Sequence, residues 1–357
     1  MSSDTRTGGR LGSVADGYND RFGHLFGEMN ALQLLFLAAS LVGLLAAPLW
    51  TSLLGVEGFL RTFALASIWA ILAMGWDIQS GYTGYISFGH AVLSGGAAYA
   101  TALLLTHVNP DLPFLVTAPI SVLVALGIGL AIAIPSLRLR GPYFSLVTFV
   151  AGLIFYQLTY AFSGITGGEL GQRVGRLQFE VAGLEVTTFD PVTRYYVMLI
   201  PMLVIAVALL YVARSNVGMI LIAIRENEEA VAAAGIDTTK FKIWSFVLSS
   251  IPMGIGGVLL AYFYGTVNPV NFLLVDRSIE MIAMAVVGGM SSILGPVGGA
   301  FLVIFLREEV LYVFGTTGRW VALWTAVLLV LVFARDGLFR KLWHKLGDRG
   351  ATGGDDE

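Results

Sequence analysis

Between two long apolar runs lies the charged segment Arg214–Lys242, RSNVGMILIAIRENEEAVAAAGIDTTKFK. The runs on either side of it, Tyr195–Val212 and Ile243–Gly265, carry no charged residue. Each is close to the length of about 20 residues that a membrane-spanning helix needs. A charged connection between two spans must lie in water, at one face of a membrane. We call residues 214–242 the charged segment, and its context predicts a helical membrane protein.

The composition points to the same class. Of the 357 residues, 56% are hydrophobic and only 13% are charged, whereas soluble domains carry about 25% charged residues. The 43 glycines favour close helix packing, since small residues let helices approach in lipid. The chain has no cysteine, which excludes disulfides and thiolate sites. We expect an all-α, polytopic integral membrane protein with about 8–10 transmembrane helices and broken or re-entrant segments.

Further apolar runs predict the other spans. Ala31–Leu54 and Phe59–Trp76 come first, and Pro113–Leu137 and Pro142–Phe162 follow later. Between these pairs lies Asp77–Leu105, whose polar, glycine-rich first half predicts a non-helical or broken part that leads into a helix.

The last third of the chain holds one more broken run. Ile279–Leu306 is interrupted by GGMSSILGPVGG, residues 288–299. At 28 residues it is long for one span, and the glycines predict two shorter helices with a turn between them. Trp320–Ala334 is the last predicted span.

Basic residues predict the orientation and the division of the chain. We expect a polar cytoplasmic arm (1–30), a transmembrane domain (31–334) and a cytoplasmic tail (335–357). Within the domain, 163–194 is expected outside and 214–242 in the cytoplasm. Arginine and lysine number 14 in the arm, the 138–140 link, the charged segment and the tail, against 7 elsewhere. Cytoplasmic connections carry such an excess, so both termini are predicted cytoplasmic, in the cell (plasma or inner) membrane.

Sequence motifs of catalysis are missing. The chain has no HExxH zinc helix, no GxSxG elbow and no P-loop. Its four histidines, His24, His90, His107 and His344, show no metal-ligand spacing. We therefore expect no enzyme, no metal and no cofactor, and no nucleic-acid partner. If ATP drives the protein, another chain must bind it.

Ionisable residues near the predicted spans leave one alternative open. The candidates for coupling to protons or ions are Asp77, His90, Arg277 and Glu280. They support an ion-coupled secondary carrier or a channel as the rival hypothesis. The competing interpretation is that they lie at span ends or pair with one another.

The charged segment itself predicts a short helix, a glycine turn and a second helix. Strong helix formers run from Val217 to Ala234, and Gly235 suits the left-handed conformation that ends a helix. Asp237 or Thr238 can cap the next helix. Charged residues that could set the register of a partner, next to the small residues Ala230–Ala234, are Arg225, Glu226, Glu228 and Glu229. The alternative is a solvated surface helix.

Four stretches, in order, resemble the permeases of branched-chain amino acid ABC importers, in particular their LivM-like branch. The charged segment resembles the coupling loop of that family, with Arg225, Glu226, Glu228, Gly235 and Lys240 in place. The other three are GYTGYISFGHAVLSGGAAYA (81–100), ITGGELG (165–171) and SIEMIAMAVVGGMSSILGPVGGA (278–300). The chain departs from the family pattern at Glu169-Leu170, at Arg335-Asp336-Gly337 and in its long arm.

The resemblance implies one subunit of a heteromeric importer. Its partners would be a homologous second permease, cytoplasmic ABC ATPase subunits that contact Arg225, Glu226, Glu228, Glu229 and Gly235, an external substrate-binding protein and the lipid bilayer. The implied cargo is branched-chain or related hydrophobic amino acids, with urea or short amides as the alternative. Candidates for the translocation path are Tyr82, Tyr85, Gly89, His90, Gly288 and Gly289, since broken helices expose polar backbone only where protein or a cavity covers it. Helix packing alone is the competing explanation for the glycines.

Overall fold

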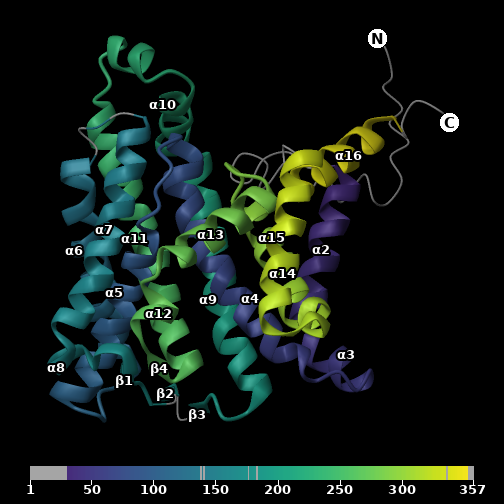
Figure 1. The fold of residues 1–357 in the computed structure, drawn as a ribbon. Coiled ribbons are helices and arrows are strands. Elements are labelled where there is room, and N and C mark those ends of the chain that lie inside the picture. Colours follow the sequence, from purple (N-terminus) through teal and green to yellow (C-terminus); the bar gives the residue numbers. More distant parts are fainter. Residues whose placement is uncertain are drawn as a thin grey trace, which may run out of the picture.

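A computed structural model describes residues 30–136, 139, 141–175, 177–181, 184–334 and 337–352. Most of them are helical (Figure 1). The α-helices are α2 Ala31–Leu45, α3 Ala47–Leu53, α4 Phe59–Trp76, α5 His90–Leu103, α6 Phe114–Ser136, α7 Pro142–Ala161, α8 Ser163–Thr166, α9 Pro191–Arg214, α10 Asn216–Ala233, α11 Thr238–Tyr264, α12 Pro269–Phe272, α13 Val275–Gly288, α14 Leu294–Phe305, α15 Gly315–Phe333 and α16 Leu338–Thr352.

Short irregular turns extend several of these helices. Asp77–Gly81 continues α4 as a π-helical turn, Leu104–Val108 continues α5, and Leu306–Val310 continues α14. Two 3₁₀ turns lie at Gly168–Leu170 and Leu311–Phe314.

The long helices are apolar enough to cross a membrane. Among the described residues, six helices pass that test, and the bent pair α2–α3, which turns by 67°, makes a seventh if counted as one span. Thr317–Phe333 in α15 is a shorter apolar helix. The expected all-α membrane architecture is therefore confirmed, whereas the bend between α2 and α3 breaks Ala31–Leu54, which was predicted as one span.

Two of the spans form the centre of the bundle. In the most apolar stretch of α4 83% of residues are buried, and in that of α11 72%, against 28% in α6, 22% in α7 and 33% in α9. The outer helices thus leave apolar side chains for lipid. Glycines bring an outer helix close to a central one: a Cβ added at Gly254 in α11 would lie 2.9 Å from the Cα of Val122 in α6.

The predicted hairpin between residues 279 and 306 is present. Helices α13 and α14 run antiparallel, and a Cβ at Gly288 would overlap the carbonyl oxygen of Gly295. With 14 and 12 residues, the helices are about 21 and 18 Å long at 1.5 Å per residue. Each is therefore shorter than the hydrocarbon core of about 30 Å, as expected for two short helices in place of one span.

The two ends of the bundle differ in what they carry. The charged segment forms α10 and the start of α11 at one end, where α16 also lies (Figure 1). We call this the segment end. The polar stretch 163–194 forms α8 and short strands at the opposite end (Figure 1).

The short strands are a difference from the all-α expectation. Two antiparallel pairs form, the first between β1 Gln172–Arg173 and β4 Thr266–Val267, the second between β2 Gln178–Val181 and β3 Leu184–Thr187. The first pair ties the polar stretch to the chain that leaves α11. Four-residue and two-residue strands are too short to show the alternating pattern by which strands are recognised in a sequence.

Several predicted features lie outside the described residues. They are residues 1–29 of the arm, Arg138 and Arg140 of the basic link, Arg335 and Asp336, and the end of the tail from residue 353.

Candidate functional site

The charged segment folds as predicted at its glycine turn. Gly235 has φ +84°, and Asp237 accepts a hydrogen bond from the backbone N of Lys240 (3.1 Å) to begin α11. Sequence reasoning missed a break inside α10. Asn227 has the extended values φ −158° and ψ 93°, and its Oδ1 accepts from the backbone N of Ala230 (3.0 Å). Asn227 therefore acts as an N-cap that starts a second short helix.

This break turns Glu228 toward the bundle. Its carboxylate accepts hydrogen bonds from Lys242 Nζ (2.7 Å), from the hydroxyl of Tyr85 and from Thr238 Oγ1 (3.1 Å). Lys242 is only 3% exposed, and its Nζ also lies 4.6 Å from the centre of the Tyr85 ring. Burial raises the pKa of Glu228, but the hydrogen bonds from Lys242 and Tyr85 and the charge of Lys242 outweigh it and hold that pKa below its ordinary value. The carboxylate of Glu228 is thus ionised at neutral pH.

Arg225 reaches inward to the ends of two other elements. Its Nη1 donates to the carbonyl of Gly81 (2.8 Å), at the end of the π-helical turn, and to the hydroxyl of Ser291, in the α13–α14 turn. Three segments far apart in the sequence therefore meet at one guanidinium.

The other predicted residues of the segment lie at its surface. Glu226, Glu229 and Gly235 are exposed, and so are Ala232 and Ala233. One side of α10 thus binds the bundle through Arg225 and Glu228, and the other presents carboxylates and small side chains to the outside.

The predicted path residues occupy two places. His90 is fully buried at the start of α5, and its Nε2 lies 2.9 Å from the Oγ of Ser249 in α11. Within the described part of the chain its Nδ1 has no hydrogen-bond partner. Gly89 packs against α7, where an added Cβ would lie 2.6 Å from the carbonyl oxygen of Thr148. Tyr82 is 5% exposed in the bend that follows α4.

Tyr85, Gly288 and Gly289 lie at the segment end. Tyr85 belongs to the Glu228 cluster described above, and Gly288 and Gly289 are at the tip of the α13–α14 hairpin. Gly289 has φ +110°, a value that favours glycine. The tail also touches this tip, because a Cβ at Gly337 would overlap the backbone of Gly289.

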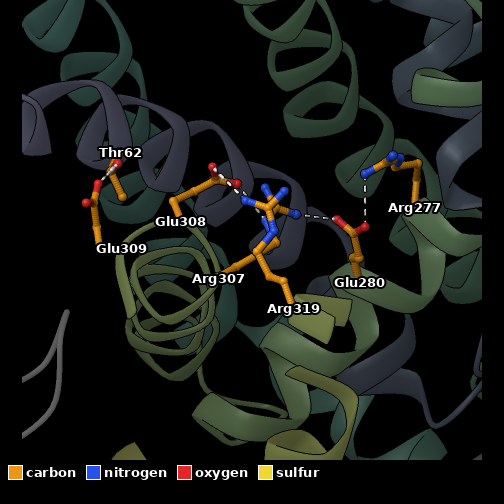
Figure 2. Close-up of polar contacts among 7 residues, drawn as sticks. All are labelled: Thr62, Arg277, Glu280, Arg307, Glu308, Glu309 and Arg319. Atoms are coloured by element: carbon orange, nitrogen blue, oxygen red, sulfur yellow. Dashed lines mark hydrogen bonds and ion pairs between the residues drawn. The ribbon is translucent and has the colours of Figure 1, made fainter. Parts of the chain in front are cut away.

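A second charged cluster lies at the base of the same hairpin, where α13 begins and α14 ends (Figure 2). Glu280 binds Arg277 (2.9 Å) and Arg307 (3.1 Å). Arg307 also binds Glu308 (2.9 Å), which lies 3.8 Å from Arg319. Beside these ion pairs, Thr62 Oγ1 donates a hydrogen bond to Glu309 Oε1 (2.5 Å). We call these residues the base network.

The ionisable candidates are therefore engaged with partners. Arg277 and Glu280 pair with each other, as one of the two interpretations expected. Asp77, fully buried, accepts hydrogen bonds from the backbone N of Ser291 (2.8 Å) and of Ser292 (3.2 Å). In the residues that the structure describes, no group of three or more His, Cys, Asp or Glu side chains is placed to hold a metal ion.

Sequence reasoning missed Ser291, Asn227 and Arg307. A signal existed for Asn227, because Asn followed by two glutamates is typical of a helix N-terminus. Nothing in the sequence pointed to the contact between Arg225 and Ser291, which are 66 positions apart.

Comparison with known proteins identifies the family. Residues 58–334 match the profile of the family described as branched-chain amino acid transport system / permease component. The chain is 29% identical over 296 residues to the high-affinity branched-chain amino acid transport system permease protein LivM of Escherichia coli, which covers 77% of this chain and 68% of LivM.

Two further relatives are similar at lower identity. The permease protein BraD of Pseudomonas aeruginosa is 24% identical over 79% of this chain and 95% of its own length. The probable permease protein LivH of Methanocaldococcus jannaschii is 25% identical over 69% of this chain and 89% of its own. No solved structure matches. Since the family profile covers the whole bundle from α4 to α15, the chain belongs to the family of permease components of branched-chain amino acid transport systems.

Proposed function

We propose that this permease component carries branched-chain or related hydrophobic amino acids across the membrane as one subunit of an ATP-driven importer. The relatives that it matches are named for branched-chain amino acid transport. A homologous second permease would complete the path, an external binding protein would deliver the cargo, and a cytoplasmic ATPase would drive the cycle. Both termini and the charged segment would then lie in the cytoplasm.

The observation that carries the proposal is the two-sided charged segment. Its inner side, with Arg225 and Glu228, binds the bundle. Its outer side exposes Glu226, Glu229 and alanines. Small side chains allow close insertion into a groove, and charges fix the register of docking and exclude wrong partners. This surface suits docking to a separate ATPase subunit.

The test is copurification. We expect Glu226→Lys together with Glu229→Lys to leave membrane insertion intact and to abolish copurification with the ATPase subunit, because the reversed charges repel the partner. The matched control is Glu57→Lys with Glu169→Lys, the same charge change on exposed residues away from the segment end. Unchanged copurification and uptake in the first variant would mean that the charged segment is only a solvated surface.

Cargo and driving force need a transport assay on the native complex. ATP-dependent uptake of leucine, compared with urea, separates the amino acid from the short-amide alternative. Uptake by the purified chain alone, driven by an ion gradient and indifferent to ATP, would establish the secondary carrier and overturn the proposal.

Sidedness can be tested with introduced cysteines, because the chain has none of its own. Ala232→Cys in the charged segment and Glu169→Cys in the polar stretch replace exposed residues. In intact cells a membrane-impermeant thiol reagent should label the second and spare the first. The reverse pattern would invert the proposed orientation.

The predicted path remains a proposal of the same kind. His90 is supported by its central burial, its contact with Ser249 and its free Nδ1 among the described residues. If His90 lines the path, His90→Ala should lower uptake while copurification with the ATPase is kept.

A further inference from the structure

The tip of the α13–α14 hairpin has a strained backbone. Ser291 has φ +60°, and it is the single non-glycine residue with positive φ in the described part of the chain. Such a conformation is unfavourable for a residue with a Cβ and persists only where the surrounding contacts fix it. The tip of a hairpin would tolerate glycine at this position. A serine there raises the question of what its hydroxyl does.

The hydroxyl and the backbone of Ser291 tie the tip to the end of α4. Ser291 Oγ donates to the carbonyl of Gly81 (2.8 Å), and the backbone N of Ser291 donates to Asp77 Oδ1 (2.8 Å). Ser292 adds a second backbone hydrogen bond to Asp77 Oδ2 (3.2 Å). The two elements are in close contact, because a Cβ at Gly81 would lie 3.1 Å from the backbone N of Ser291. The tip and the π-helical turn thus form one unit.

Arg225 of α10 binds both parts of this unit, the hairpin tip and the π-helical turn. Its Nη1 donates to the carbonyl of Gly81 on one side and to the hydroxyl of Ser291 on the other. The stem of the side chain packs on the bend after the turn, since a Cβ at Gly84 would lie 3.1 Å from Arg225 Cγ. Any displacement of α10 therefore acts on α4 and on the hairpin together.

We propose that Arg225 and Ser291 form the joint that transmits movement of the charged segment to the α13–α14 hairpin. This rests on the proposed function, in which an ATPase moves the charged segment. Arg225 is then a positioning residue: it touches neither cargo nor nucleotide, and it makes the end of α4 and the hairpin follow α10. Ser291 keeps its left-handed backbone because its hydroxyl is a part of the joint.

Arginine suits this role better than lysine. A guanidinium is planar and presents several donors in a fixed geometry, so it can bind two acceptors on different elements at once. An ammonium on a flexible stem is a point charge. We therefore expect Arg225→Lys to restore only part of what Arg225→Ala removes.

The experiment compares ATP hydrolysis with uptake in the reconstituted complex. For Arg225→Ala we expect copurification and ATP hydrolysis to persist and the amount of cargo moved per ATP to fall about tenfold, the size of a typical coupling between sites. Ser291→Gly, which suits the positive φ but lacks the hydroxyl, should do the same. Because the two residues act through one contact, the double variant should lose little more than either single variant.

Lys341→Ala is the matched control, since it removes a positive charge from an exposed residue of α16, which lies at the same end of the bundle, and leaves the joint intact. It should keep the wild-type ratio of uptake to hydrolysis. Two results would overturn the proposed joint. One is an unchanged amount of cargo moved per ATP in Arg225→Ala, and the other is a loss in the double variant that equals the product of the two single losses. Loss of copurification in Arg225→Ala would also overturn it and would place Arg225 in the docking surface. If the variant with Glu226→Lys and Glu229→Lys loses copurification while Arg225→Ala keeps it and moves less cargo per ATP, docking and coupling depend on different residues, and both proposals are supported.

Discussion

The α13–α14 hairpin is held by charged side chains at both ends, and the two ends are built differently. At its base Glu280 and Arg307 are 3% and 4% exposed and form direct ion pairs. At its tip Arg225 is exposed and binds a neutral carbonyl and a neutral hydroxyl. Removing one partner of a buried pair costs about 3–5 kcal/mol, whereas a hydrogen bond from a charged group contributes about 1.5–3 kcal/mol. The base is therefore the fixed end, and the tip is the end that can move with α10.

The largest effect is expected at the base. Arg307→Ala would leave Glu280 with Arg277 alone and Glu308 with Arg319 at 3.8 Å. We expect a loss of about 3–5 kcal/mol in the free energy of unfolding, because the buried carboxylate of Glu280 loses one of its two counter-charges and Glu308 loses the nearer of its two. The measurement is the melting temperature of the purified protein in detergent. Arg340→Ala, at an exposed arginine of α16, is the control. If Arg307→Ala were as stable as this control, the base of the hairpin would not be its fixed end.

An intermediate effect is expected between the two ends. In Gly288→Ala the new Cβ would overlap the carbonyl oxygen of Gly295, so α13 and α14 must separate. Such overpacking costs about 1–3 kcal/mol, and it should make the tip more accessible to limited proteolysis. At Gly43 in α2 an added Cβ meets nothing within 4 Å, so Gly43→Ala should be neutral or slightly stabilising. Equal behaviour of the two variants would show that the hairpin is loosely packed.

The smallest effect is expected at the segment end and depends on pH. The pKa of Glu228 is held below its ordinary value of 4.5, so its ionised form stabilises the fold above that value and the stabilisation is lost as the pH falls through the lowered pKa. Since the side chain of Glu228 is 18% exposed, the contribution is about 1 kcal/mol or less.

Glu228→Gln tests this contribution, because it removes the charge and keeps the shape. Its melting temperature should lie below that of the wild type at neutral pH, and the difference should shrink below about pH 4.5. A difference that stays constant down to pH 3 would show that the charge of Glu228 does not stabilise the segment.

Local features of this fold could be predicted from the sequence, because they follow from the length of apolar runs and from glycine positions. The predicted run Phe59–Trp76 coincides with α4. The hairpin was predicted from residues 288–299, and the helix end from Gly235. Each of these depends on neighbours a few residues away.

Contacts between distant segments could not be predicted in the same way. Arg225 was noticed for its charge, and its partners Gly81 and Ser291 are 144 and 66 positions away. Glu280 was noticed as an ionisable residue, but Arg307, which binds it from 27 positions on, was not. Hydrophobic patterns determine which stretches cross the bilayer and leave open which span ends meet. The assignment of docking and path residues stays a prediction until the variants are measured.

The contact between α2 and α16 has a consequence for how the chain is made. The side chain of Gln33 donates to the carbonyl of Trp343 in α16 (3.1 Å), 310 positions later. Domains form from the N-terminus as the ribosome advances. The first half of α2 therefore stays without its contact to α16 until nearly the whole chain has been inserted. Messages that stop before codon 338 would release a protein whose helix α2 never meets its partner α16, and quality-control proteases should remove it faster than the full-length chain.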